Sequence, residues 1–196
     1  MAGSARYTAI LDACVLFPPA VADTLISLHV AGLYTARWTA RIDAEWINAA
    51  VRDHNKPREK LERRRDAMRA AVPDWEVQPA SYETLIIGRD LPDSKDEHVI
   101  AAALAGHADC IVTSNLKHFP NTVLDPLGLE AIHPDDFIVN QLDLDPYPAL
   151  AAFKNMRARL RKPSMTAEEF VAAIERIFPA IYNSRVMLNF GNPRNA

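Results

Sequence analysis

Short apolar runs alternate with longer amphipathic segments over most of this chain. The apolar runs are rich in β-branched or aromatic residues, which is typical of strands. These runs are 7–11, 34–38, 75–78, 110–113 and 129–132. Because each run is followed by a segment with helical spacing of apolar residues, the pattern predicts an α/β fold. We expect three layers, α/β/α, around a mainly parallel central sheet.

The predicted helices begin at recognisable start signals. Pro18 and Pro19 open a helix that runs to about Ala31. Thr39 is a candidate cap for the next helix, and another helix begins at about Phe137. The remaining predictions are a charged helix over 56–71 and a short helix over 82–87.

The stretch from 91 to 120 carries the most informative pattern. Ser94 followed by Glu97 has the spacing of a capping box, so we expect a helix to start near Lys95. Gly106 is expected to end that helix in the left-handed conformation. A fully apolar run at 110–113 then predicts a strand that is buried on both faces.

Polar residues gather at both ends of this helix–strand unit. Asp93 and Asp96 lie at the start of the helix, while Ser114 and Asn115 follow the strand. An α/β sheet usually binds its ligands at the carboxyl ends of its strands. These residues are therefore the first candidates for a functional site.

The last quarter of the chain has helical spacing and no strand signal. Pro146 and Pro148 indicate a linker, and Thr166 with Glu169 forms a second candidate capping box. We therefore predict a main domain over 1–142, a helical extension over 143–190 and a frayed tail over 191–196.

Composition narrows the functional classes. The chain has 196 residues and a formal net charge of −3, so it lacks the overall positive field of many nucleic-acid binders. Cys14 and Cys110 are far apart in apolar runs and are expected to be buried free thiols. No apolar run approaches the length of about 20 residues that spans a membrane, and the N-terminus lacks a signal-peptide pattern. A soluble, cytoplasmic protein without a membrane partner is expected.

The charged helix over 56–71 has two interpretations. Its consecutive arginines, Arg63, Arg64 and Arg65, suggest a phosphate-binding patch. The same helix places acidic residues three or four positions from its arginines, which is typical of a solvated face with internal ion pairs. Both interpretations stay open at this stage.

Three acids occupy positions where elements are expected to meet the sheet edge. Asp12 follows the first strand, Glu45 borders the apolar stripe of the second long helix, and Asp96 begins the later helix. Asp43, by contrast, is expected to project away from that stripe. Each acid alone could be a helix cap. Together, converging carboxylates repel each other unless a divalent cation neutralises them, and oxygen ligands favour Mg²⁺ or Mn²⁺.

Four motifs carry a resemblance to a known family. They are LDACVLFP at 11–18, IDAEW at 42–46, LPDSKDEHVIAAALA at 91–105 and IVTSNLKHFP at 111–120. In this order and spacing they resemble a PIN domain. The chain is also similar to VapC-type toxins that carry an extra helical segment at the C-terminus, as AIHPDDF at 131–137 and the helical tail suggest.

The resemblance implies a metal-dependent endoribonuclease with Mg²⁺ or Mn²⁺ as its cofactor. The metal-binding acids of the family fall on Asp12, Glu45 and Asp96. Asp93 is expected to hold water or metal in an outer shell. Thr113 and Ser114 are expected to orient a phosphate or a water. Partners implied by the family are an RNA substrate, a cognate antitoxin and a second copy of the chain in a homodimer.

This chain departs from the family at the fourth acidic position, which falls on Asn115 or His118. Asn115 can coordinate through its carbonyl oxygen but contributes no charge, so a second metal site would be weakened. RNA binding is expected from Lys117, His118 and the three consecutive arginines of the charged helix.

Two alternatives are left open. The first is a PIN-like protein that binds RNA or a partner without cutting. The second is a receiver domain that is phosphorylated on Asp12, but receivers place the phosphoacceptor in mid-domain with an acidic pair before it, whereas Asp12 ends the first strand.

Overall fold

The computed structural model describes residues 7–161 and 164–183, so the predicted tail at 191–196 lies outside the described residues. Four parallel strands form one sheet in the order β2-β1-β3-β4. The strands are β1 (Thr8–Leu11), β2 (Thr35–Arg37), β3 (Cys110–Val112) and β4 (Glu130–Ile132). The predicted parallel sheet is therefore confirmed.

Strand register decides which side chains meet at the carboxyl edge of the sheet. Leu11 of β1 pairs with Val112 of β3, and both strands are buried there. The backbone N–H of Asp12 donates to the carbonyl of Val112 at 3.1 Å. The next residues, Asp12 and Thr113, consequently leave the sheet side by side.

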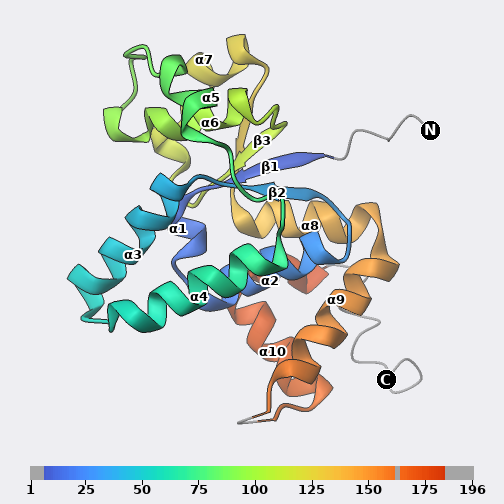
Figure 1. Ribbon diagram of the computed structural model, residues 1–196. Coiled ribbons are helices and arrows are strands. Elements are labelled where there is room, and N and C mark those ends of the chain that lie inside the picture. Colours follow the sequence, from blue (N-terminus) through green and yellow to red (C-terminus); the bar gives the residue numbers. More distant parts are fainter. Residues whose placement is uncertain (1–6, 162–163, 184–196) are drawn as a thin grey trace.

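Helices cover both faces of the sheet, as expected for three layers (Figure 1). On one side lie α5 (Pro79–Tyr82), α6 (Glu97–Ala105) and α7 (Asn121–Leu124). On the other lie α1 (Ala13–Leu16), α2 (Pro19–Val30) and α8 (Pro134–Leu144). Next to α1, α3 (Ala40–His54) and α4 (Arg58–Ala71) form an antiparallel pair. Among the described residues, no helix is both long and apolar enough to cross a membrane.

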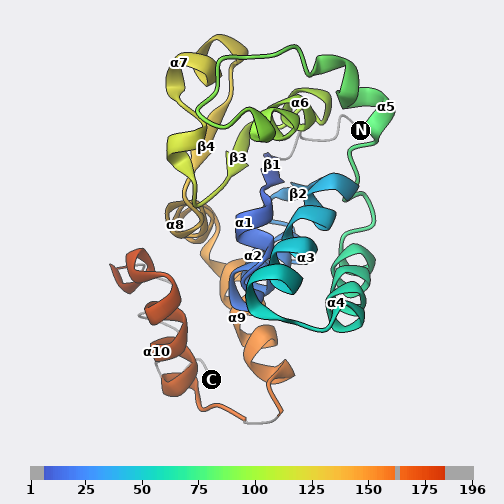
Figure 2. The same cartoon turned by 90° about the vertical axis from the view of Figure 1, so that its left-hand side faces the viewer.

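The C-terminal segment is helical, as expected. In it, α9 (Pro146–Arg159) packs against α2 and α8, and α10 (Ala167–Ile177) lies farther from the sheet (Figure 2). The capping box of Thr166 and Glu169 is present at the start of α10. The predicted linker is wrong, because Pro146 and Pro148 lie in the first turn of α9. Proline is tolerated there since the first helical N–H groups have no partner within the helix.

The predicted strand at 75–78 is reduced to one parallel bridge, between Trp38 and Glu76. Trp38 exchanges backbone hydrogen bonds with Trp75 and Val77 at 2.8 and 2.9 Å. Pro79 then starts α5, and a proline offers no N–H for a longer ladder. The short helix predicted over 82–87 is divided between α5 and a 3-10 turn, η1 (Glu83–Leu85).

The start of α6 differs from the prediction. Asp93, not Ser94, supplies the cap, by accepting from the N–H of Lys95 at 2.9 Å. A 3-10 turn, η2 (Ser94–Asp96), precedes α6. The carboxylate of Glu97 points instead to an earlier loop, where it accepts from the N–H groups of residues 87–89 at 2.9–3.1 Å.

The end of α6 also differs. Gly106 has a right-handed φ of −82°, and the left-handed residue is His107, with φ 49°. A Cβ at Gly106 would lie 3.0 Å from both the Ala102 carbonyl oxygen and Val77 Cγ2. Glycine is needed here for close packing of the helix end against its neighbour, and not for backbone conformation.

Candidate metal centre

Asp12 lies at the carboxyl end of β1 and forms the N-cap of α1. Its Oδ1 accepts from the N–H of Ala13 at 2.6 Å, and its Oδ2 accepts from the hydroxyl of Thr113 at 2.7 Å. The side chain is nearly buried, at 6% exposure. The carboxylate is therefore held by three elements, β1, α1 and β3.

Cys14 is a third polar neighbour of Asp12. Its thiol donates to Asp12 Oδ2 at 3.1 Å, and its sulfur accepts from the N–H of Ser114 at 3.2 Å. Burial and the negative charge of Asp12 raise the pKa of the Cys14 thiol to about 12, so it stays protonated. Cys14 is only partly buried, whereas Cys110 is buried; both are free thiols, as expected.

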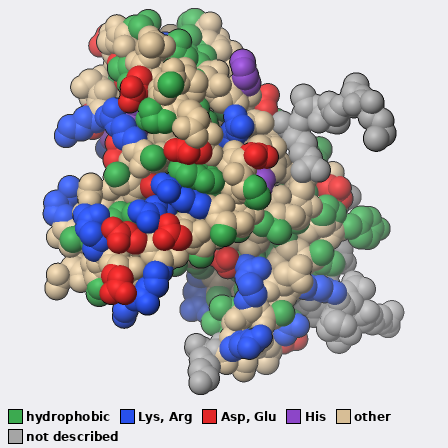
Figure 3. All heavy atoms as spheres, viewed as in Figure 1, with side chains coloured by type: hydrophobic (Ala, Val, Ile, Leu, Met, Phe, Trp, Pro, Cys, Tyr) green, Lys and Arg blue, Asp and Glu red, His purple; other side chains and the backbone are tan. Residues whose placement is uncertain are grey.

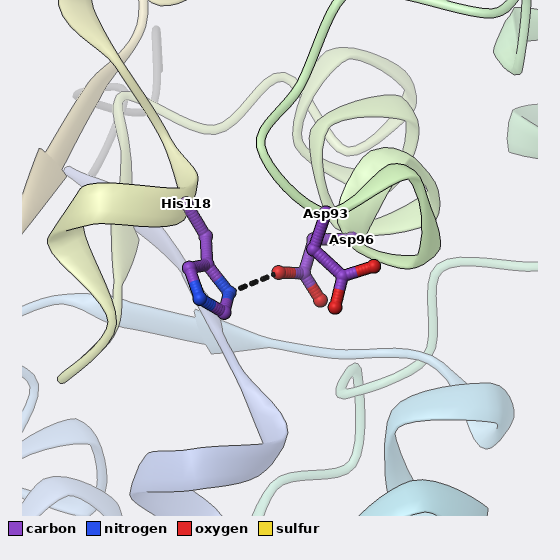
Figure 4. A group of neighbouring side chains, drawn as sticks. All are labelled: Asp93, Asp96 and His118. Carbon is purple, nitrogen blue, oxygen red and sulfur yellow. Dashed lines mark hydrogen bonds and ion pairs between the residues drawn. The ribbon is translucent and has the colours of Figure 1, made fainter.

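A second group of ligand atoms lies at the start of α6. Asp93 and Asp96 come from η2 and the residue before it, and His118 comes from a separate 3-10 turn, η3 (Leu116–His118). The Nδ1 of His118 is 2.7 Å from Asp96 Oδ2 (Figure 4). One ligand atom from each of these three residues lies within 4.8 Å of the others.

The charges of this edge are not balanced. Burial raises the pKa of Asp96, and the charges of Asp12 and Asp93 raise it further, while the hydrogen bond and charge of His118 lower it. The pKa of Asp96 is therefore raised mainly because the carboxylate is partly removed from water, and the two neighbouring carboxylates add to this effect. A cation placed among these oxygens would relieve that repulsion.

Glu45 reaches this edge from α3. Its Oε1 lies 2.9 Å from Nε2 of His98, a buried residue of α6, and 3.4 Å from Nε of Arg41. The Glu45–His98 pair is within ion-pair distance, although the atoms are not aligned for a hydrogen bond. His98 Nδ1 has no hydrogen-bond partner among the described residues. The pair joins α3 to α6 beside the acidic group.

Asp43 has a role that the sequence interpretation missed. It was expected to project away from the apolar stripe, but its side chain is buried, at 1% exposure. It accepts from the indole N–H groups of Trp38 at 3.1 Å and Trp46 at 2.9 Å, and it pairs with Arg69 at 2.8–2.9 Å. Two tryptophans that both need an acceptor were the sequence signal for this buried carboxylate.

Residues after β3 form hydrogen bonds that connect the side chains and loops of the sheet edge. Thr113 is buried, and its hydroxyl donates to Asp12 while accepting from the N–H of Asn115 at 3.0 Å. The carbonyl of Asn115 accepts from the N–H of His118 at 2.8 Å. Ser114 and Lys117 are exposed, and Asn115 is partly buried. This chain of hydrogen bonds connects the position of Asp12 to that of His118.

The three consecutive arginines of α4 do not form one surface patch. Arg63 pairs with Glu59 at 3.2 Å and Arg65 with Asp66 at 2.8 Å, so acidic and basic side chains are intermixed over this region (Figure 3). The guanidinium of Arg64 donates to the carbonyls of Leu16 and Phe17 and lies 4.8 Å from the centre of the Trp46 ring. Consecutive helical residues project in different directions, which separates the three roles. RNA binding by these arginines stays a prediction.

The donor set at the sheet edge fits a divalent cation. Ligand atoms of Asp93, Asp96 and His118 lie together there, Asp12 is close enough for its charge to act on Asp96, and Glu45 contacts His98, two residues after Asp96. Carboxylate oxygens suit Mg²⁺ or Mn²⁺. Burial and the charges of Asp12 and Asp93 raise the pKa of Asp96, so a cation bound beside it would favour its ionised form. Asn115 and His118 follow β3, and the imidazole of His118 adds a nitrogen donor beside Asp96.

Comparisons with known proteins agree with this architecture. The family model described as PIN domain matches residues 8–117, and a second, described as VapC50 C-terminal domain, matches residues 134–178. A curated relative from Mycobacterium tuberculosis (strain ATCC 25618 / H37Rv), named "Putative ribonuclease VapC50", is 39% identical over 97 residues. This match covers 44% of the present chain and 57% of the relative. No solved structure matches the chain.

Both parts of the resemblance drawn from the motifs are confirmed, the PIN-like part and the helical C-terminal segment. The PIN-domain match covers more than half of the chain and includes all of the candidate metal ligands from Asp12 to Asn115. This chain belongs to the PIN-domain family.

Proposed function

We propose that this protein is a divalent-metal-dependent endoribonuclease, the toxin of a toxin–antitoxin pair. The observation that carries the proposal is the group of Asp93, Asp96 and His118, whose ligand atoms lie within 4.8 Å of one another, close enough to Asp12 for its charge to act on Asp96. Such unbalanced carboxylates at the carboxyl edge of a PIN-family sheet are suited to metal-assisted hydrolysis of a phosphodiester. The name of the relative, a ribonuclease, supports RNA as the substrate class.

The residues of this chain would divide the work as follows. A bound divalent ion lowers the pKa of a water ligand and polarises the scissile phosphate. Asp12, held in place by Thr113 and the N–H of Ala13, would present a fixed carboxylate to that ion. Asp96 would present a second carboxylate, and Glu45, packed against His98, a third. We infer that Asp93 and Ser114 act from outside the direct ligands of the ion, by positioning water or phosphate.

Binding of the RNA backbone is proposed for basic residues at two places, the sheet edge and α4. Lys117 is exposed one residue before His118, and Arg63 and Arg65 lie on α4. Their contribution would be electrostatic, so RNA affinity is expected to fall as salt rises. Arg64 is expected to contribute least, because its guanidinium is held by two backbone carbonyls.

Asp12→Ala tests the proposal directly. We expect it to reduce Mg²⁺- or Mn²⁺-dependent cleavage of RNA by about a thousandfold or more, because it removes a metal ligand. A chelator should do the same to the unaltered protein. Circular dichroism and thermal unfolding of the variant provide the control for folding. Cleavage at the original rate by well-folded Asp12→Ala would refute the assignment.

A second candidate function is a PIN-like protein that binds RNA without cutting it. The neutral Asn115 and the imidazole of His118 at the fourth acidic position favour this alternative. The two functions differ in their need for metal. A binding protein should bind RNA equally well after Asp96→Asn and in chelator, and should show no cleavage under any metal.

We also propose that the chain binds a cognate antitoxin and forms a homodimer, as its VapC-type relatives suggest. An antitoxin that blocks the acidic edge would present basic or aromatic side chains to it. Light scattering of the purified protein tests the dimer: a mass of one chain at all concentrations would contradict it. Co-expression with the product of a neighbouring gene tests the antitoxin. If that product is the antitoxin, it should inhibit the Asp12-dependent cleavage of RNA.

A further inference from the structure

We propose that His118 is a nitrogen ligand of the cation at this edge and that it makes the site select Mn²⁺ over Mg²⁺. The inference rests on the proposed metal centre and goes beyond it, because it names which ion the centre prefers and which residue decides. The resemblance places the fourth acidic position of the family on Asn115 or His118, and neither is an acid in this chain.

The first argument is geometric. His118 Nδ1 lies 2.7 Å from Asp96 Oδ2, and Asp93, Asp96 and His118 each offer one ligand atom within 4.8 Å of the others (Figure 4). Ligand atoms that share one ion lie at most about 4–5 Å apart, since each is about 2.0–2.5 Å from the metal. The imidazole is therefore already within the reach of an ion bound by Asp96.

The second argument is that the fold positions this imidazole. The backbone N–H of His118 donates to the Asn115 carbonyl at 2.8 Å, and Phe119, the next residue, is buried at 1% exposure. Asn115 is held in turn by the hydroxyl of Thr113, which also binds Asp12. His118 is thus connected by hydrogen bonds to Asp12, and its side chain is only 24% exposed.

The third argument is chemical. Mg²⁺ prefers oxygen ligands, and it loses a charged one when an acid is replaced by imidazole. Imidazole nitrogen is a good ligand for divalent transition ions, which bind nitrogen more strongly than Mg²⁺ does. A site with carboxylates and one imidazole should therefore lose affinity for Mg²⁺ more than for Mn²⁺.

A competing role for His118 makes the opposite prediction. If the imidazole serves only as a cationic partner of Asp96, it occupies the place of the metal and competes with it. Removing it would then strengthen the binding of both ions. If His118 is a ligand, removing it weakens Mn²⁺ binding and leaves Mg²⁺ binding less changed.

The test uses the full chain and Mn²⁺ itself as a spectroscopic probe. Pulsed electron paramagnetic resonance of bound Mn²⁺ detects a directly coordinated nitrogen through its hyperfine coupling. We expect the coupling in the unaltered protein and its loss in His118→Asp, which restores an acid. His98→Gln, which alters the other imidazole near the site, should keep the coupling. Coupling that is absent from the unaltered protein, or lost only in His98→Gln, would overturn the proposal.

Calorimetric titration with Mn²⁺ and with Mg²⁺ supplies the second readout. We expect His118→Ala to weaken Mn²⁺ binding by about tenfold or more. His118→Asp should narrow the ratio of Mg²⁺ to Mn²⁺ dissociation constants by about tenfold, mainly through tighter Mg²⁺ binding. Tighter Mn²⁺ binding by His118→Ala would show that the imidazole competes with the ion, which overturns the proposal.

The outcomes separate this inference from the proposed function. Nitrogen coupling together with full cleavage by Asp12→Ala would contradict the nuclease assignment and leave the ligand assignment standing. Metal-dependent cleavage that requires Asp12, but without nitrogen coupling, would contradict the ligand assignment alone. A protein to which no Mn²⁺ binds contradicts both.

Discussion

Two sets of buried or partly buried carboxylates in this protein differ in how their charge is compensated. Asp43 accepts from two indole N–H groups and pairs with Arg69, while Glu97 accepts from three backbone N–H groups and pairs with Arg89. Asp12 and Asp96 receive only a hydroxyl, a thiol, one backbone N–H and an imidazole. No lysine or arginine forms an ion pair with either of these two in the part of the chain that the structure describes.

The pKa values reflect this difference. Burial alone would raise the pKa of Glu97, but the three N–H groups and Arg89 outweigh it, so the pKa of Glu97 is lowered. The pKa of Asp96 is raised, first by burial and then by two carboxylate neighbours. The fold supplies compensating charge where a carboxylate holds elements together. At the sheet edge, Asp12 and Asp96 have no ion pair with lysine or arginine among the described residues, and we propose that a metal ion supplies the positive charge there.

The largest expected effect on stability follows from removing a compensated carboxylate. Asp43→Ala leaves Arg69 and two buried indole N–H groups without their acceptor, so we expect the free energy of unfolding to fall by about 3–5 kcal/mol. Urea unfolding measures it. The control is Asp53→Ala, which removes an exposed acid paired only with its neighbour Arg52 and should change little. A small effect of Asp43→Ala would contradict the claim that Asp43 is a compensated carboxylate that stabilises the fold.

The next effect concerns Asp12 and Asp96, the carboxylates at the sheet edge. Mn²⁺ at about 100 times its dissociation constant should raise the free energy of unfolding by about 2.7 kcal/mol, because the ion binds only the folded edge. Thermal unfolding with and without Mn²⁺ measures this change. Asp12→Asn and Asp96→Asn should show much smaller increases. An equal increase in these variants would place the ion elsewhere in the protein.

Glu97→Gln should lower the free energy of unfolding by about 2 kcal/mol at neutral pH, since hydrogen bonds to the charged carboxylate are lost. The pKa of Glu97 is lower in the folded than in the unfolded state, so its stabilisation is complete above the unfolded value and declines as pH falls through the folded value. The difference between the two proteins should therefore shrink in acid. Unfolding curves measured from neutral pH to about pH 3 test this, and a gap that widens in acid would contradict it.

The smallest effect has the opposite sign. The pKa of Asp96 is raised by folding, so ionising Asp96 destabilises the protein as pH rises from the unfolded value through the folded one. Asp96→Asn should therefore be more stable than the unaltered protein at neutral pH, by about 1 kcal/mol or less, and the advantage should disappear in acid. Metal-free unfolding at two pH values measures it. A variant that is less stable at neutral pH would show that Asp96 is compensated after all.

Much of the fold was predictable from local pattern. Strand positions, the parallel arrangement, the capping box before α10 and the PIN-domain motifs all depend on residue types at short spacing. The grouping of Asp93 with Asp96 at one helix start was also predicted, because they are only three positions apart. That His118 would lie 2.7 Å from Asp96 was not, since the two residues are 22 positions apart in the chain.

The sequence by itself therefore determined the family, the alternation of strands and helices, and the closeness of Asp93 to Asp96. Only the tertiary structure decided which acids are compensated. Asp43 depends on Arg69, 26 positions away, and Gly106 is required by a close approach to Val77. The periodicity of apolar residues reports which face of an element is buried. It does not report which distant donor will reach a buried charge, because that depends on how the elements pack.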